Sequence, residues 1–218
     1  MPLADRIRSG LQAVADPERA AGQQAYMKSA MPFYGVPVPE VRRVARAAAK
    51  GEADPDVLLE SALELWNGAT RREERYAALA LLGLRPLRAD PRLIPLIEHM
   101  VRTGRWWDYT DELAHRVAEA HDARPAETAE LVRRWSVDDD FWMRRIAILS
   151  QLGRRDRVDR DLLAAVIEPN TADREFFVRK AIGWALREYA RVDPEWVRRF
   201  VAQHELSPLS VREALKHL

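Results

Sequence analysis

Residues 104–112 read GRWWDYTDE, and they begin the helical segment from which the fold and the candidate site are both inferred. If residues 106–121 form one helix, its apolar stripe carries Trp106, Thr110, Leu113 and Val117. Consecutive side chains on a helix point about 100° apart, so the two adjacent indoles cannot both face the core. We therefore expect Trp106 in the core, and Trp107 at the surface beside Asp111.

Helical periodicity recurs along the whole chain, whereas strand patterns are almost absent. Breaks at Pro, Gly and Asp-Pro predict helices near 2–15, 18–30, 38–50, 56–67, 70–84, 91–103, 106–121, 125–136, 139–153, 159–168, 173–191, 194–204 and 208–217. Asp-Pro recurs as an opening, with Asp as cap and Pro in the first turn, at 16–17, 54–55, 90–91 and 193–194. A spacing of about 35–40 residues per helix pair favours an all-α solenoid of HEAT-like pairs over a globular bundle. No Gly/Ser-rich linker interrupts the chain, so we expect one domain over residues 1–218.

The composition excludes several classes of protein. There is no cysteine, which excludes disulfides, thiolate nucleophiles and Cys-ligated metals and fits a reducing cytoplasm. The N-terminus lacks the apolar segment of a signal peptide, and the longest apolar run, YAALALLGL at 76–84, is too short to span a bilayer. The five histidines show no zinc spacing, and no P-loop, dinucleotide-binding loop or GxSxG motif occurs. A soluble cytoplasmic protein without metal or cofactor is expected.

The chain is rich in charge but almost neutral overall. Its 35 Lys and Arg residues balance 34 Asp and Glu residues, which leaves a net charge of +1. All but four of the basic residues are arginine, the residue best suited to two-point contacts with phosphate or carboxylate, although genomic base composition also explains this bias. If the protein binds nucleic acid, a local patch must therefore provide the contact, because the global charge will not.

Two further stretches display polar or aromatic side chains in unusual places. In FFVRKAIGWALREYA (176–190), the buried stripe is Val178, Ile182, Ala185 and Tyr189. Lys180 and Arg187 share the opposite face with Trp184, so this indole is expected at the surface between two cations. In DDDFWMRRIAILSQL (138–152), the stripe is Trp142, Ile146 and Leu149. Arg144 points away from that stripe, but Arg145 lies next to it and must find an anion: Asp111, another carboxylate or a phosphate.

Each of these features also has a purely structural explanation. Trp107 can cap the edge of a neighbouring helix pair, Arg145 can form a structural salt bridge, and Trp184 can pack between repeats. Their combination is more informative than any one of them. Together they could line one concave surface, on which aromatic rings and cations suit bases, sugars and phosphates.

The motifs WWDYTD, FWMRRIAIL and FFVRKAIGWALREYA resemble those of the DNA alkylation repair enzymes of the AlkD type. Further similar stretches are QQAYMKSAMPFYGVPVPEVRRV (23–44), LWNGATRREERYAAL (65–79) and LSPLSVREALKHL (206–218). The resemblance covers nearly the whole chain. It implies HEAT-like repeats in a curved solenoid with a basic concave surface for duplex DNA. It also implies a glycosylase of base excision repair that releases N3- and N7-alkylated purines, such as 3-methyladenine and 7-methylguanine.

The resemblance nominates site residues by motif: Trp107 and Asp111 in WWDYTD, Arg145 before IAIL, Trp184 in AIGW, and Tyr26 in AYMK, with Lys180 and Arg187 beside Trp184. It implies that Asp111 stabilises the oxocarbenium-like sugar and positions water, with the two indoles against the cationic sugar and base. Arg145 is expected to hold a backbone phosphate.

The enzyme implied by this resemblance is monofunctional, because no lysine near WWDYTD suits a lyase, and it cleaves without a base-flipping pocket. A monomer suffices to hold duplex DNA. Two alternatives remain open. One is a non-catalytic HEAT-like scaffold that binds DNA or protein, and the other is a hydrolase of a non-DNA N-glycoside.

Overall fold

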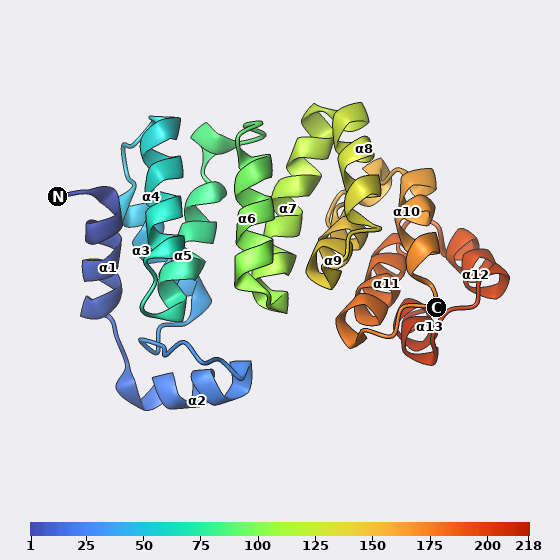
Figure 1. Cartoon of the computed structure of the whole chain (residues 1–218), viewed down its shortest axis with the longest axis horizontal. Coiled ribbons are helices and arrows are strands. Elements are labelled where there is room, and N and C mark those ends of the chain that lie inside the picture. The colour runs from blue at the N-terminus through green and yellow to red at the C-terminus, as the bar shows by residue number, and fades with distance from the viewer. The chain divides into compact units, whose positions relative to one another are not determined.

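The computed structural model describes residues 1–218 and is entirely helical (Figure 1). Thirteen α-helices and three short 3₁₀ turns follow one another without a strand, which confirms the all-α prediction. The chain divides into two compact units, residues 1–93 and 94–218, which are described separately below. The single domain expected from the sequence stays a prediction. No helix has the length and apolar character needed to cross a membrane.

The N-terminal unit contains α1 (Leu3–Ala13), α2 (Pro17–Met27), α3 (Val38–Ala48), α4 (Pro55–Asn67), α5 (Arg72–Leu82) and the 3₁₀ turn η1 (Arg85–Leu87). Four of them, α1, α3, α4 and α5, pack on one another. Their shared core is completely buried and includes Ile7, Leu11, Val41, Leu58, Leu65, Trp66 and Leu81. By contrast, α2 runs across the ends of these helices (Figure 1) and leaves Tyr26 77% exposed.

The loop between α2 and α3 is held by a buried carboxylate. Glu73 is fully buried in the first turn of α5 and accepts hydrogen bonds from the backbone N–H groups of Tyr34, Gly35 and Val36, at 2.9, 2.9 and 3.0 Å. Gly35 has φ = +89°, and a Cβ atom there would lie 1.9 Å from the carbonyl oxygen of Asp16. The loop can therefore pass this close to the start of α2 only with glycine at this position.

The C-terminal unit contains nearly all of α6 (Leu93–Gly104), then α7 (Trp107–Ala123), α8 (Pro125–Trp135), α9 (Phe141–Leu149), η2 (Arg155–Arg157), α10 (Arg160–Ile167), η3 (Glu168–Asn170), α11 (Phe176–Tyr189), α12 (Pro194–Gln203) and α13 (Pro208–Ala214). Its helices stack in a regular order. Helix α7 packs on α9, α9 on α11, and α11 on α13, while α8 packs on α10. Alternate helices thus form a continuous row, the arrangement expected when successive helix pairs stack.

The predicted helices agree with the observed ones to within a few residues at each end. Three of the four Asp-Pro openings act as expected, because Asp16, Asp54 and Asp193 each accept a hydrogen bond from a backbone N–H in the first helical turn. The fourth does not begin a helix. Asp90 instead accepts from the backbone N–H of Arg92 at 2.9 Å in a turn, and α6 begins only at Leu93.

Candidate functional site

Asp111 and Arg145 form a two-point ion pair between α7 and α9. The Nε and Nη2 atoms of Arg145 donate to Oδ1 and Oδ2 of Asp111 at 2.8 and 2.9 Å. Each residue lies in the second turn of its helix. Arg145 is only 3% exposed, whereas the Asp111 side chain keeps 16% of its surface accessible. The anion required by Arg145 is therefore Asp111, and the carboxylate is the member of the pair that meets solvent.

A third helix fixes the guanidinium from the opposite side. The Nη1 atom of Arg145 donates to the backbone carbonyl of Phe177 at 2.5 Å, and the Phe177 ring centroid lies 5.9 Å from the guanidinium carbon. Phe177 belongs to the first turn of α11. One buried side chain thus ties α7, α9 and α11 together, and the orientation of Asp111 depends on all three helices.

This arrangement revises the role expected for Arg145 from the sequence. A phosphate contact requires donor groups at the surface, but Arg145 is buried and three of its N–H groups already bind Asp111 and Phe177. A two-point Arg–carboxylate pair also restricts the geometry of both partners. We therefore assign Arg145 to the positioning of Asp111, and no longer to a contact with the DNA backbone.

Aromatic rings pack beside this ion pair. The Phe177 ring centroid lies 4.9 Å from that of Trp142 and 5.9 Å from that of Trp106, and the two indoles are 6.3 Å apart. Trp106 is the residue before α7, with extended backbone, and is half-buried in this cluster. Helix α7 begins one residue later than predicted, but Trp106 still packs on the buried ring of Trp142 and so lies on the core side, as expected. The other stripe positions, Thr110, Leu113 and Val117, are fully buried as predicted.

The two other predicted indoles remain available. Trp107 begins α7, Trp184 lies in the third turn of α11, and both are half-buried. Trp107 therefore exposes less of its surface than the sequence led us to expect. Trp106 and Trp142 pack on other rings at tilted angles, whereas neither Trp107 nor Trp184 forms a ring contact or a side-chain hydrogen bond. An indole that keeps part of its surface accessible and has no internal partner for its N–H group is suited to contact a ligand.

The cationic face predicted around Trp184 is partly compensated by one carboxylate of the last helix. Glu213 of α13 pairs with Lys180 at 2.7 Å and with Arg187 at 2.6 Å. Hydrogen bonds from Lys180 and Arg187 hold the pKa of Glu213 below its usual value. Both cations predicted beside Trp184 are therefore paired, with one negative charge set against two positive ones. Their anion lies in a separate helix, so the local sequence around Trp184 gives no sign of it.

A close helix contact holds Glu213 in this position. A Cβ atom at Gly183 would lie 2.4 Å from Glu213 Cβ and 2.8 Å from the carbonyl oxygen of Ser210. The hydroxyl of Ser210 also donates to the backbone carbonyl of Arg179 at 2.9 Å. Glycine in the middle of α11 therefore allows α13 to pack directly on its backbone.

Arg144 also differs from its predicted role as a surface arginine. It pairs with Asp173 at 2.9 Å and donates to the backbone carbonyls of Asp138 and Asp139 at 2.7 and 3.1 Å. These contacts tie the start of α9 to the segment before α11. Arg144 and Arg145 thus both hold the helix starts of this region together.

Burial dominates the electrostatics of Asp111. Loss of solvent raises the pKa of Asp111 above its ordinary value, and the opposing hydrogen bonds from Arg145 offset this only in part. Asp122, three turns further along α7, behaves in the opposite way. Burial also raises its pKa, but hydrogen bonds from Arg154 and Arg157 bring the net pKa below the ordinary value. Of these two arginine-bound carboxylates on one helix, Asp111 is the more destabilised as an anion.

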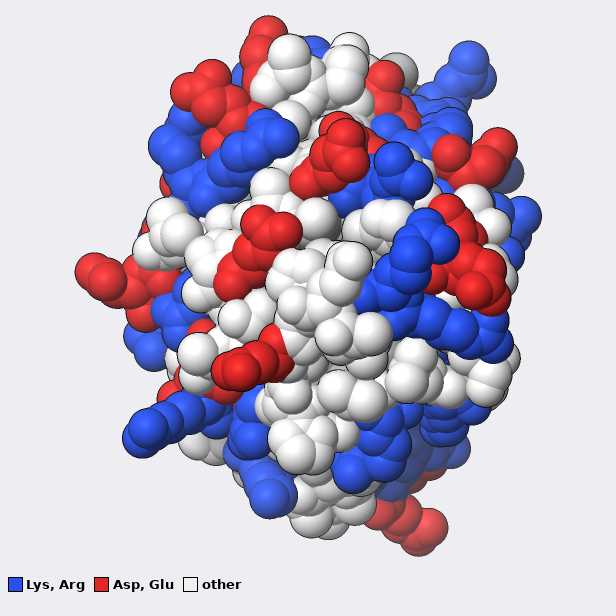
Figure 2. All heavy atoms as spheres, turned by 90° about the vertical axis from the view of Figure 1, so that its right-hand side faces the viewer, with Lys and Arg blue, Asp and Glu red and all other residues white.

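The surface charge of the molecule is mixed where Figure 2 shows it. On this side, which carries α12, blue and red side chains alternate around an uncharged strip, and no continuous basic patch is visible. A nucleic-acid contact thus finds no extended cationic surface on this face.

Tyr26, the remaining predicted site residue, belongs to α2 of the N-terminal unit. No group of three His, Cys, Asp or Glu side chains is arranged to hold a metal ion.

Comparison with known proteins gives a consistent result. A family model described as DNA alkylation repair enzyme matches residues 7–218. The chain is 30% identical to a solved structure described as a predicted DNA alkylation repair enzyme from Enterococcus faecalis, with a TM-score of 0.85 and coverage of 94% of this chain and 96% of that one. The structure of smu.31 from Streptococcus mutans UA159 shares the fold at 19% identity, with a TM-score of 0.65 over 83% of this chain and 92% of that one. No curated protein matches.

The match of the family model to nearly the whole sequence agrees with the structural similarity to the Enterococcus faecalis protein. It also covers all three helices that meet at Arg145. The chain therefore belongs to the DNA alkylation repair enzyme family, and its role is in the repair of alkylation damage.

Proposed function

We propose that this protein is a monofunctional DNA glycosylase that excises cationic N3- and N7-alkylated purines from duplex DNA. The observation that carries the proposal is the partly exposed Asp111 carboxylate, fixed at two points by Arg145. A carboxylate held in one orientation by a buried guanidinium stabilises positive charge that develops in front of it, without the cost of reorganising at the moment of reaction.

The chemistry of the lesion determines what such a site must supply. A purine alkylated at N3 or N7 already carries a positive charge. When the C1′–N bond breaks, the bonding electron pair stays with the purine and neutralises it, so no general acid is needed. The positive charge moves to the sugar, which becomes oxocarbenium-like. Water then adds to C1′ and loses a proton, and an abasic site remains in the DNA.

In this scheme Asp111 faces the cationic sugar, lowers its energy and accepts the proton of the attacking water. Trp107 and Trp184 offer their free ring faces to the sugar and the base, since aromatic faces attract cations. Tyr26 is proposed as a further DNA contact, in keeping with its exposed position. Arg145 does not touch DNA, but keeps Asp111 oriented and favours its ionised form.

The test is release of free 7-methylguanine from methylated duplex DNA by the wild type and by Asp111→Asn, measured as single-turnover rates with saturating enzyme. Asn cannot provide the negative charge, and we expect the rate to fall by about 100-fold or more. Asp122→Asn is the matched control, because Asp122 lies on the same helix and also binds a largely buried arginine, Arg154, at 2.9 Å. We expect it to excise at the wild-type rate.

Three outcomes discriminate between the candidate functions. Release by the wild type and by Asp122→Asn, but not by Asp111→Asn, supports the proposal. Equal release by all three proteins contradicts the role of Asp111. No release by any of them, with methylated DNA still bound, favours a non-catalytic scaffold. Circular dichroism of each variant checks that the helices are intact.

A further inference from the structure

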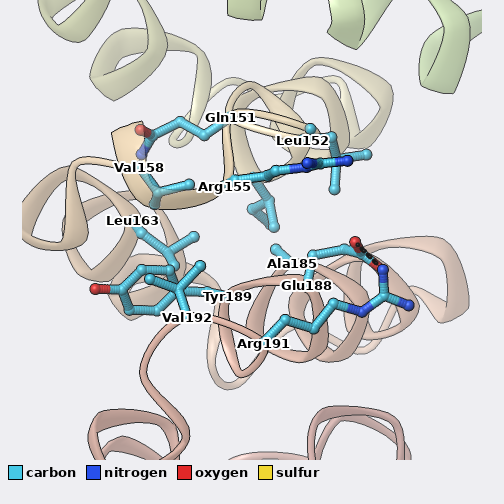
Figure 3. A pocket seen from close by; sticks show the side chains of 12 residues that line it. Gln151, Leu152, Arg155, Val158, Leu163, Ala185, Glu188, Tyr189, Arg191 and Val192 are labelled. Carbon is cyan, nitrogen blue, oxygen red and sulfur yellow. Dashed lines mark ion pairs between the residues drawn. The ribbon is translucent and has the colours of Figure 1, made fainter.

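A cavity of about 420 Å³ lies in the C-terminal unit, between the C-terminal ends of α9 and α11 and the loop that contains η2 (Figure 3). Phe177 lies at the other end of α11, whereas Arg145 lies in the middle of α9, about one turn before the cavity lining begins at Ile148. The walls are mostly apolar and include Leu152, Val158, Leu163, Ala185, Tyr189 and Val192. This volume falls within the range of about 300–1,000 Å³ that is typical of small-molecule sites.

Most of the polar groups around the cavity are already paired. Gln151 Oε1 accepts from Arg154 Nη1 at 2.5 Å and from the backbone N–H of Asp159 at 2.8 Å, and its Nε2 donates to the Asp159 carbonyl at 2.9 Å. Glu188 pairs with Arg191 at 3.3 Å. These groups have little capacity left for a ligand, and they hold the walls of the cavity in place.

Arg155 is the exception. It is exposed, and its guanidinium forms no ion pair or hydrogen bond. In Figure 3 its side chain extends along one side of the cavity, and the Glu188–Arg191 pair lies across from it. Arg155 also has φ = +55°, a left-handed backbone conformation that is uncommon for residues other than glycine and clusters at functional sites. The cavity thus has one uncompensated positive charge beside an apolar interior.

Two features keep the interior open. Ala185 is the smallest side chain in the apolar wall, where a leucine or methionine would fill the space. Val192, next to the end of α11, is 42% exposed although it belongs to the same apolar wall. Leu163 and Ala185 are only 2% and 6% exposed, so Val192 is the part of this wall that meets water, and an apolar ligand would cover it.

We propose that this cavity binds a small organic monoanion with an apolar body, of the size of a medium-chain or aryl carboxylate. The anionic group pairs with Arg155, and the apolar body packs on Leu163, Ala185 and Val192. Charge-assisted contact at the rim sets the orientation, and burial of the hydrocarbon provides most of the binding free energy. Because α9 and α11 both contribute to the cavity, the ligand bridges the two helices that also meet through the contact between Arg145 and Phe177.

The experiment is isothermal titration calorimetry of the full chain with three probes. Octanoate has both the charge and the apolar body, octan-1-ol lacks the charge, and acetate lacks the body. We expect octanoate to bind saturably at one site and more tightly than either of the others. Arg155→Gln should weaken octanoate about tenfold and leave octan-1-ol unchanged. Arg133→Gln is the matched control, because Arg133 is an exposed and unpaired arginine of α8 that does not line the cavity.

Two variants test the apolar part of the site. Ala185→Met fills the cavity and should abolish binding of octanoate and octan-1-ol alike. Val192→Asp places a carboxylate at the exposed rim and should weaken octanoate more than octan-1-ol; like Arg155→Gln, it changes an exposed position and leaves the packed core intact. The proposal is overturned if octanoate shows no saturable binding to the wild type, or if Arg155→Gln and Val192→Asp bind it as the wild type does.

Discussion

Asp111 and Arg145 face each other through two hydrogen bonds of 2.8 and 2.9 Å, and yet burial still raises the pKa of Asp111. Both the two hydrogen bonds and the raised pKa result from the position of the pair in the fold. The pair lies where three helices meet, so Arg145 loses almost all of its contact with water, and Asp111 most of its own. Removing one partner of such a pair leaves an uncompensated buried charge, which costs about 3–5 kcal/mol of folding free energy.

The pH dependence of excision should report the ionisation of Asp111. Because only the carboxylate stabilises a cationic sugar, activity falls as Asp111 is protonated. Its raised pKa places this fall at a higher pH than that of an ordinary aspartate, which titrates near about 3.9. The single-turnover rate of 7-methylguanine release as a function of pH, corrected for spontaneous depurination, measures this limb. A limb at or below the ordinary value would contradict the assignment.

The raised pKa of Asp111 also makes the free energy of unfolding depend on pH, in a direction that can be stated. A carboxyl group whose pKa is higher in the folded state binds protons more readily when folded. Its contribution to the free energy of unfolding is therefore greatest below the unfolded pKa and declines as the pH rises through the folded pKa. For Asp122, whose pKa is lowered, the contribution is present at neutral pH and is lost on acidification. Comparing the pH dependence of urea unfolding of Asp111→Asn and Asp122→Asn with that of the wild type should show opposite differences.

Replacing Arg145 should affect catalysis without changing the electrostatics of DNA binding. In Arg145→Gln the orientation of Asp111 is lost and its pKa rises further, so we expect excision to fall at least tenfold. Because Arg145 is buried away from the phosphates, the dependence of DNA affinity on salt concentration should stay as in the wild type. A slope reduced by about one unit would instead mean that Arg145 contacts a phosphate. Arg145→Lys keeps the charge but not the two-point contact, and should also impair excision.

Glu213→Gln should strengthen DNA binding. The substitution keeps the shape of the side chain but releases Lys180 and Arg187 from their anion, next to Trp184. Each cation that then meets a phosphate steepens the salt dependence of affinity by about one unit, so we expect an increase of one to two units. Glu205→Gln removes the same charge from an exposed position without an ion pair and serves as the control. Equal changes in both variants would indicate only a general effect of net charge.

Gly183→Ala should destabilise the C-terminal unit. The added methyl group overlaps Glu213 and the Ser210 backbone, so α13 has to move away from α11. Such overpacking typically costs about 1–3 kcal/mol. Gly22→Ala is the matched control, since a Cβ atom at Gly22 in α2 has nothing within 4 Å and improves helix propensity by up to about 1 kcal/mol. Calorimetric unfolding should show a lower midpoint for the first variant and an unchanged or higher one for the second.

The sequence predicted the features that depend on local periodicity. Apolar stripes placed the helices and their buried faces correctly, and the position of Arg145 beside such a stripe correctly implied a buried guanidinium in need of an anion. Asp111 was one of the three anions considered, beside another carboxylate and a phosphate. Helical periodicity could not decide which of these anions Arg145 binds.

The missed contacts share a different physical cause. Arg144 was expected at the surface, and Lys180 and Arg187 on the face opposite the buried stripe. Each of them pairs with a carboxylate more than twenty positions away in the sequence, which periodicity did not reveal. Helical periodicity tells which side of a helix is polar, and it does not tell whether another helix later covers that side. The start of α7 was predicted one residue too early, so Trp106 caps the helix and does not belong to its first turn.

The polar contacts that run from Asp111 to Arg145 and on to the Phe177 carbonyl constrain how this chain can recombine with its relatives. A chimaera with its junction between α8 and α9 inherits the carboxylate from one parent and the guanidinium from the other. A junction between α9 and α11 separates the guanidinium from the carbonyl that holds it. A junction placed before α7 leaves the carboxylate, the guanidinium and the carbonyl in the same parent sequence. The segment from α7 to the first turn of α11 contains all three of these groups, so transferring it as one block keeps the contacts that orient Asp111 within one parent sequence.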